Sequence, residues 1–169
     1  MQTNSGGKSI MLERFGISAE SENFRETSIY GLACVYSLIE KQIAYYLRPY
    51  HLTVPKFNAL MVIKHIGKDT GLSQGELGRR LIVTPSNITR LLDRLEQDGY
   101  IERISRKGDR RVNLIRITKN GSDILDKVWP GYRNRINELA NNLTQDEQKL
   151  LSKMMLEWFS KLNNGSKTL

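Results

Sequence analysis

The sequence predicts a mainly α-helical protein with one small β-hairpin, an α+β fold. Apolar residues recur at helical spacing before residue 99 and again after residue 118. Two capping boxes, Ser73-x-x-Glu76 and Thr144-x-x-Glu147, mark the starts of helices. Between the two helical parts, residues 100–105 and 111–117 have the pattern of strands, and residues 106–109 form the predicted turn between them.

Composition limits the classes of protein to consider. The chain has 169 residues, of which 39% are hydrophobic and 26% charged, which is ordinary for a soluble globular domain with an appended arm. The single cysteine excludes an internal disulfide, and no segment has the pattern of a signal peptide or a membrane span. We therefore expect a cytoplasmic protein without a membrane partner. The net charge of +8 favours a polyanionic partner.

The first helix is predicted to pack against a second subunit. Residues 1–24 are rich in Ser, Gly and Glu, and we expect a mobile arm there. Residues 25–50 have the spacing of a helix that is apolar on nearly all sides, and Pro49 is expected to end it. A helix of this kind is buried on most faces, so in a small protein it needs a partner surface.

Residues 52–118 are predicted to form a unit of three short helices and the hairpin. The first helix covers residues 55–65, and Gly67 is expected to take the positive φ of a C-terminal cap. The second helix opens at the first capping box and covers residues 73–81. The third covers residues 85–99. It is expected to bury one face, which carries Ile88, Leu91, Leu92 and Leu95.

The C-terminal part, residues 119–163, is predicted to complete a helical dimerisation region together with residues 25–50. Its first helix contains Pro130, which is expected to kink it. Its last helix follows Thr144 and carries an apolar face that also needs a partner surface. That face consists of Leu150, Leu151, Met154, Met155, Trp158, Phe159 and Leu162.

Two short helices with a tight connection, followed by a hairpin, have the element order of a winged helix-turn-helix. In that fold the second helix of the pair lies in the major groove of DNA. Its exposed face is predicted to carry Ser86, Asn87, Thr89, Arg90 and Arg94. Arginine can bond guanine and asparagine can bond adenine. The two arginines could instead be ordinary solvated charges, with Arg94 paired to an acid of the same helix, Asp93, Glu96 or Asp98.

The hairpin, or wing, carries a strong concentration of charge. Residues 103–119 contain seven Lys or Arg residues and one acid, a net charge of +6. The cations are Arg103, Arg106, Lys107, Arg110, Arg111, Arg116 and Lys119. A thin hairpin cannot bury so many cations in a core, so the pattern favours contact with phosphates or insertion into a narrow minor groove.

These segments resemble the MarR family of transcription regulators. The matching text is LSQGELGRRLIVTPSNITRLLDRLEQDGYIERI followed by GDRRVNLIRITKNG. The wing signature of the family is D-x-R, five residues, then Leu or Ile and Thr. Here it is Asp109-Arg110-Arg111, VNLIR and Ile117-Thr118. The resemblance implies that Arg111 enters the minor groove, that Arg110 is a second cation at the wing tip and that Asp109 orients the wing.

The resemblance further implies a homodimer whose two winged lobes read a palindromic site in double-stranded DNA. We expect a repressor that responds to a ligand. Aromatic or anionic effectors bind relatives between the dimerisation helices and the DNA-binding lobe. Four aromatic residues are candidates for such a pocket, although they could equally be core residues: Tyr45, Tyr46, Trp129 and Tyr132.

Three alternatives remain open at this point. Cys34 could sense peroxides, as a cysteine does in some relatives, although a single cysteine is more often a packing residue. A winged helix can also bind protein instead of DNA. No arrangement typical of an enzyme is recognised, and the two histidines are too few and too far apart for a metal site, so we expect no enzyme, metal or cofactor.

Overall fold

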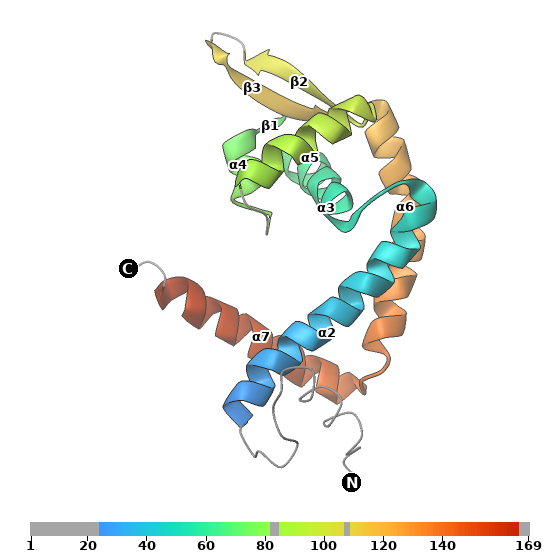
Figure 1. The fold of residues 1–169 in the computed structure, drawn as a ribbon, viewed down its shortest axis with the longest axis vertical. Helices are drawn as coiled ribbons and strands as arrows, with labels where there is room; N and C mark the ends of the chain where they lie inside the picture. Colours follow the sequence, from blue (N-terminus) through green and yellow to red (C-terminus); the bar gives the residue numbers. More distant parts are fainter. Residues whose placement is uncertain (1–23, 82–84, 107–108, 166–169) are drawn as a thin grey trace. The chain divides into compact units, whose positions relative to one another are not determined.

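A computed structural model describes residues 24–81, 85–106 and 109–165 (Figure 1). The N-terminal half contains α2 (Phe24–Leu47), a 3-10 turn (Arg48–Tyr50), α3 (Val54–Val62), a π-helical turn (Ile63–Gly67), β1 (Leu72–Ser73) and α4 (Gln74–Gly78). They are followed by α5 (Pro85–Gln97), β2 (Ile101–Arg106), β3 (Asp109–Ile117), α6 (Lys119–Ala140) and α7 (Gln145–Gly165). The chain divides into two compact units, Met1–Val128 and Trp129–Leu169.

The mainly helical fold with a small β-sheet is confirmed. The predicted N-terminal arm, residues 1–24, lies outside the described residues except for Phe24, which begins α2. Helix α2 ends at Leu47, before Arg48 and Pro49, because a residue that precedes proline is disfavoured in the α conformation. Pro130 lies inside helix α6, which continues on both sides of it.

The core of the first unit lies between α3, α5 and the sheet, which Figure 1 shows grouped together. Its fully buried side chains include residues of α3, the π-helical turn, α4, α5 and β3: Phe57, Leu60, Ile63, Leu77, Leu92, Leu95 and Ile115. From α2, only Ile43 and Leu47 are buried. The described residues of the second unit include no buried hydrophobic side chain. The apolar side chains of α6 beyond Val128 and of α7 therefore have no core of their own in a single unit.

The connection after α3 differs from the prediction. Thr53 caps α3 by accepting a hydrogen bond from the Lys56 amide, but the regular helix ends at Val62 and gives way to a π-helical turn. Gly67 lies inside that turn, so its predicted positive φ is wrong. The positive φ is taken by Lys68, at 44°, and by Gly71, at 77°. The chain needs these turns because β1 must pass close to β3.

The small helix α4 begins as predicted and ends earlier. Ser73 and Glu76 form both hydrogen bonds of the capping box. The helix stops at Gly78, three residues before the predicted end at Leu81. The short length is compatible with a tight connection, because the next helix, α5, begins at Pro85. Helix α5 ends at Gln97, and Gly99, predicted as its end, has a φ of 72°.

The sheet has three antiparallel strands in the order β1-β3-β2, of which the sequence predicted two. Strand β1 pairs through Leu72 with Ile115 and through Ser73 with Leu114. Gly71 is required beside this pairing, because a Cβ there would lie 2.9 Å from the Ile115 carbonyl oxygen. The two-residue β1 therefore fixes the start of α4 against the middle of β3.

The second unit contains the rest of α6 and the whole of α7. The second capping box is confirmed: the Glu147 carboxylate accepts from the Thr144 amide at 2.8 Å, and Thr144 Oγ1 accepts from the Glu147 amide at 3.3 Å. This box starts α7 where the sequence predicted it. In the described part of the chain, no helix has both the length and the apolar character needed to cross a membrane.

Candidate nucleic-acid interface

Helix α5 is positioned by a buried apolar face. Ile88, Leu92 and Leu95 are buried, as predicted, while Leu91 is only half-buried. The helix lies close to α4, since a Cβ on Gly78 would come within 2.8 Å of Ile88 Cδ1. Burial on one side leaves the opposite side of α5 to solvent, which is the arrangement that a DNA-reading helix needs.

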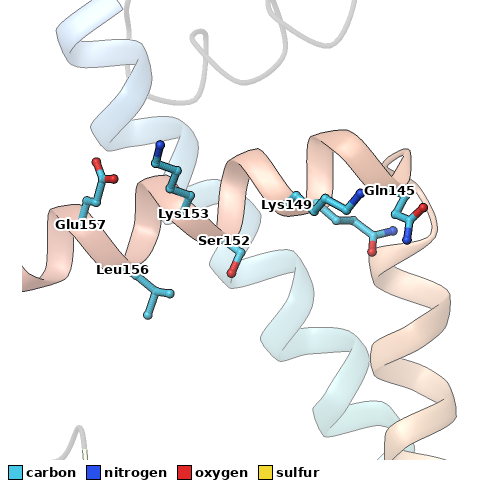
Figure 2. A pocket seen from close by; sticks show the side chains of 7 residues that line it. Gln145, Lys149, Ser152, Lys153, Leu156 and Glu157 are labelled. Atoms are coloured by element: carbon cyan, nitrogen blue, oxygen red, sulfur yellow. The ribbon is translucent and has the colours of Figure 1, made fainter.

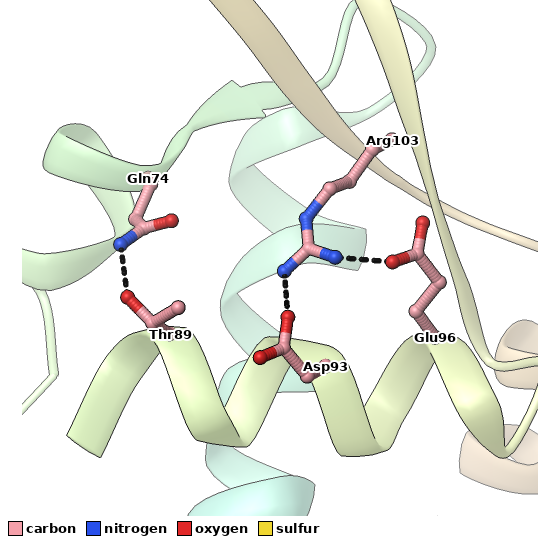
Figure 3. Close-up of polar contacts among 5 residues, drawn as sticks. All are labelled: Gln74, Thr89, Asp93, Glu96 and Arg103. Carbon is pink, nitrogen blue, oxygen red and sulfur yellow. Dashed lines mark hydrogen bonds and ion pairs between the residues drawn. The ribbon is translucent and has the colours of Figure 1, made fainter. Parts of the chain in front are cut away.

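The exposed side of α5 carries four of the five side chains predicted to read DNA. Asn87, Thr89, Arg90 and Arg94 are all exposed. The side chain of Ser86 lies outside the described part of the structure. Thr89 is partly engaged, because its hydroxyl oxygen accepts a hydrogen bond of 2.9 Å from Gln74 Nε2 (Figure 3). This bond connects the start of α4 to the reading face of α5.

The two arginines of α5 are free of acidic partners among the described residues. The three acids of this region, which could have paired on the helix itself, contact other elements. Asp93 and Glu96 bind Arg103 of β2, and Asp98 binds Lys56 of α3 at 2.5 Å. The interpretation in which Arg94 pairs with an acid of its own helix is therefore wrong. Arg90 and Arg94 remain available to an external anion.

The charge of the wing is lower than the sequence count indicates, because each of the three cations whose side chains the structure describes has an acidic partner. Arg103 contacts Asp93 and Glu96. Arg116 Nε lies 2.8 Å from Glu102 Oε1, and Lys119 Nζ lies 3.6 Å from Asp123 Oδ2. The sequence count began after Glu102 and could not include acids from other elements. Charge that a sequence segment carries is thus distinct from charge that it offers to DNA.

Arg103 makes the best-defined contact between the wing and α5 (Figure 3). Its Nη2 donates to Asp93 Oδ1 at 2.6 Å, and its Nη1 donates to Glu96 Oε2. The hydrogen bond to Asp93 is the main cause that raises the pKa of the Arg103 guanidinium, and partial burial opposes it. From the sequence alone, Arg103 is predicted to be one of the phosphate-binding cations. The positions of Asp93 and Glu96 one turn apart on a helix were the signal that could have suggested this pairing.

The base of the wing is held by α6. Thr118 Oγ1 donates to the Gly99 carbonyl at 2.7 Å and accepts from the Gly121 amide at 3.1 Å, so it caps α6. The Thr118 amide donates to the Tyr100 carbonyl at 3.0 Å. Gly121 is buried directly against this carbonyl. None of these contacts is predicted from the sequence, in which Thr118 is recognisable only as part of the family signature.

The backbone of the wing tip contains an irregularity next to the signature residues. Ser105 pairs with Asn113, but Arg106 pairs with Asp109, so residues 110–112 have no partner in β2. A bulge of this kind interrupts a ladder and redirects the side chains on the bulged strand. Arg110 and Arg111 lie in this stretch. Their side chains and that of Asp109 lie outside the described part of the structure, so their predicted contacts remain predictions.

The four aromatic candidates for an effector pocket fall into different settings. Tyr45, with 71% of its surface exposed, lines a hollow of about 860 Å³ beside α2 that also includes Lys41, Arg48 and His51. Tyr46 does not line that hollow; its hydroxyl donates to the Val128 carbonyl at 2.8 Å. In the second unit, Trp129 and Tyr132 stack with ring centroids 5.6 Å apart, and burial raises the pKa of Tyr132.

Two further candidates give no defined chemistry. Cys34 is a half-buried free thiol of α2, with no hydrogen-bond or ionic partner among the described residues. Those residues also include no cluster of three His, Cys, Asp or Glu side chains placed to hold a metal. A second hollow, shown in Figure 2, is lined only by residues of α7, including Lys149, Lys153 and Leu156. It is one open side of a helix, and its polar side chains do not converge on a point.

A reading helix with one buried face, a preceding short helix and a hairpin wing on a three-stranded sheet define a winged helix-turn-helix protein. The model of the MarR family matches residues 52–112. The chain is 34% identical over 112 residues to the HTH-type transcriptional repressor YetL of Bacillus subtilis (strain 168), which covers 66% of each chain. The chain belongs to the MarR family, as its sequence predicted.

Two further comparisons agree with this membership. The HTH-type transcriptional regulator PapX of Escherichia coli is 37% identical over 92 residues, which are 53% of this chain and 56% of PapX. The match therefore spans less than two thirds of the length of either curated relative. The crystal structure of an E. coli MarR mutant complexed with operator DNA is 28% identical, with a TM-score of 0.71, and covers 81% of this chain and 98% of that chain.

Proposed function

We propose that the chain is a dimeric, sequence-specific regulator that binds a palindromic operator in double-stranded DNA and acts as a ligand-responsive repressor. The observation that carries the proposal is the exposed face of α5. Asn87, Arg90 and Arg94 lie there without acidic partners among the described residues, opposite a buried apolar face. The structural neighbour crystallised with operator DNA and the relative named as a repressor support this proposal.

A homodimer is supported by the apolar surface that each unit exposes. Exposed side chains follow α2 through more than half of its length: Phe24, Ile29, Leu32, Val35, Tyr36, Leu38 and Ile39. Helix α7 exposes a second set: Leu150, Leu151, Met154, Leu156, Phe159 and Leu162. Exposed apolar surface of this extent is typical of an interface. A second copy of the chain would cover it and would supply the second reading helix.

Two reading helices in a dimer can bind successive major grooves only when they are about 34 Å apart. An effector that favours a dimer with another spacing would therefore release DNA without contacting it. The hollow that contains Tyr45, Lys41 and Arg48 is a candidate position for an aromatic or anionic effector in the first unit. Occlusion of a promoter by the bound dimer would account for repression.

Fluorescence anisotropy tests the proposal with a labelled duplex from upstream of the protein's own gene and a scrambled duplex of the same composition. We expect saturable binding that prefers the native duplex at physiological salt. Arg90→Ala and Arg94→Ala should weaken binding by about ten- to a hundredfold, since a good arginine–base contact contributes about 1–3 kcal/mol. Lys153→Ala on α7 is the matched control and should bind like the wild type.

The wing is tested in the same assay by its salt dependence. Arg111→Ala should weaken binding and should lower the slope of log K against log salt by about one if Arg111 contacts a phosphate-lined groove. Equal binding to both duplexes that disappears at physiological salt would contradict the proposal. It would leave a winged helix that binds a partner other than this DNA, such as a protein.

A further inference from the structure

We propose that Arg103 is a positioning residue for DNA binding, which holds the wing at a fixed angle to the reading helix α5 through Asp93 and Glu96. We call these three residues the wing clamp. The inference rests on the proposed function, because its effect is measured as DNA affinity. It differs from the usual interpretation of a wing cation as a phosphate contact, since it assigns Arg103 no contact with DNA.

The geometry of the wing clamp is that of a fork between two carboxylates. Asp93 and Glu96 are three residues apart, so their side chains share one side of α5. Arg103 reaches them from β2 with its two terminal nitrogens, Nη2 to Asp93 and Nη1 to Glu96 (Figure 3). A guanidinium fork is planar and rigid, so two such bonds fix an orientation as well as a distance.

The three side chains are partly shielded from water, which gives the contact more weight than a fully exposed ion pair. Relative exposure is 26% for Arg103, 47% for Asp93 and 39% for Glu96. An isolated surface pair of similar exposure contributes little to global stability. The clamp is therefore expected to act mainly on the direction of the wing, and much less on whether the protein folds.

Three sets of contacts hold the wing: α6 at its base, β1 along the edge of β3, and Arg103 on the side that faces α5. At its base, Thr118 and Gly121 hold Gly99 and Tyr100 against α6. Among the described side chains, Arg103 makes the outermost hydrogen bonds and ion pairs between the hairpin and α5. Beyond Ile104 and Leu114, no third strand from the described part of the chain joins the hairpin, and a two-stranded ribbon is marginally stable by itself. Without Arg103, the wing could rotate about its base toward or away from α5, because β1 holds only the opposite edge of the sheet.

A small rotation at the base would displace the tip by a large distance. Six residues of β2 extend about 20 Å at roughly 3.3 Å per residue. A rotation of about 10° would therefore move the tip by about 3 Å, which is half of the roughly 6 Å width of the minor groove. Cations at the tip and the reading face of α5 would then no longer fit one duplex at the same time.

Substitutions of the two acids distinguish the clamp from simple repulsion of phosphates, because the two explanations predict opposite changes in DNA affinity. If Asp93 and Glu96 only repel phosphates, then Asp93→Asn and Glu96→Gln should tighten DNA binding. If they hold Arg103, the same substitutions should weaken binding to the operator. We expect the double variant Asp93→Asn/Glu96→Gln to lose about tenfold in operator affinity, because charged hydrogen-bond partners of a guanidinium are strong enough for such an effect. Asp98→Asn removes one carboxylate charge next to α5 and releases Lys56 instead of Arg103, so it should not weaken binding.

Variants of Arg103 separate positioning from phosphate contact. Arg103→Lys keeps the charge but loses the fork, and Arg103→Gln loses both. Both should weaken operator binding by about tenfold, while the salt slope stays at the wild-type value. Binding to a scrambled duplex should change less, because non-specific binding does not require the wing and α5 to fit together. Thermal unfolding at a fixed protein concentration verifies that each variant is folded.

Amide hydrogen exchange in the free protein gives an independent readout. In Arg103→Gln and in the double acid variant, the amides of residues 104–113 should exchange faster than in the wild type. The amides of α3 should exchange at the wild-type rate. Any one of three results would overturn the inference. The first is unchanged amide exchange in the wing, and the second is unchanged or tighter operator binding by the acid variants. The third is a salt slope lowered by about one in Arg103→Gln. If the wild type binds no operator, the proposed function fails, whereas the exchange experiment still decides whether the clamp holds the wing.

Discussion

Replacing Gly121 by alanine should destabilise the protein, although glycine is normally the poorer residue in a helix. Gly121 is the third residue of α6. A Cβ there would lie 2.9 Å from both Ile117 Cγ1 and the carbonyl carbon of Tyr100, and closer still to the Tyr100 oxygen. That oxygen already accepts a hydrogen bond from the Thr118 amide. The backbone of α6 must therefore move away from the base of the wing.

The magnitude follows from three contributions. Overpacking of a buried site costs about 1–3 kcal/mol. Strained or broken hydrogen bonds of Thr118, to Tyr100 and to Gly99, add about 1 kcal/mol each. The higher helix propensity of alanine offsets about 0.5–1 kcal/mol of this loss in stability. The net loss is about 2–4 kcal/mol, which should lower the melting temperature by about 5–15 °C for a chain of this size.

The matched control is Gly75→Ala in α4. A Cβ at Gly75 would meet only the flexible end of Arg79, at 3.9 Å, so the substitution has room. It makes the same change to the unfolded chain and should stabilise the protein by up to about 1 kcal/mol. Thermal unfolding of both variants measures the difference. The protein concentration is kept equal, because the proposed dimer would melt at a concentration-dependent temperature. A Gly121→Ala variant as stable as Gly75→Ala would refute the close approach of α6 to the wing base.

Three further predictions concern local contacts. Lys68→Gly should raise the free energy of unfolding by about 1 kcal/mol in chemical denaturation, because Lys68 has φ 44° and ψ −135°, a conformation that glycine adopts without strain. Ser73→Ala should raise the pKa of Glu76 in an NMR titration, because the hydrogen bonds between Glu76 and Ser73 hold that pKa below its ordinary value. In the wild type this cap contributes stability at neutral pH, and the contribution is lost as the pH falls through the lowered pKa. An unchanged titration of Glu76 in Ser73→Ala would contradict the cap. Arg116→Gln should leave the salt slope of DNA binding unchanged, because Arg116 is bound to Glu102; a slope reduced by about one would show that Arg116 contacts phosphate.

The elements that the sequence predicted well are those with strong local signals. The capping boxes at Ser73 and Thr144 appear as predicted, because each is formed by residues three apart in the chain. The buried face of α5 follows from its periodic apolar residues, and Ile88, Leu92 and Leu95 are buried. The family followed from the wing signature and its spacing relative to the preceding helices.

The elements that the sequence missed depend on distant parts of the chain. Strand β1 has two residues and exists only because β3 offers it a partner, so no periodic pattern could reveal it. The positive φ falls on Lys68, against local preference, because the connection from the π-helical turn to β1 requires it there. Tertiary context overrides the propensity of a single residue in such a turn.

The charge of the wing illustrates the same limit for function. Counting residues 103–119 gives a net charge of +6, and this count ranks Arg103 and Arg111 as equivalent cations. The structure separates them, because Arg103 is bound by two acids of α5, whereas Arg111 lies in the bulged stretch of β3 that has no partner in β2. An arginine whose donors are committed inside the protein releases few counterions from DNA, and its contribution must come through geometry. The same residue type, eight positions apart, is thus expected to hold the wing in one case and to contact DNA in the other.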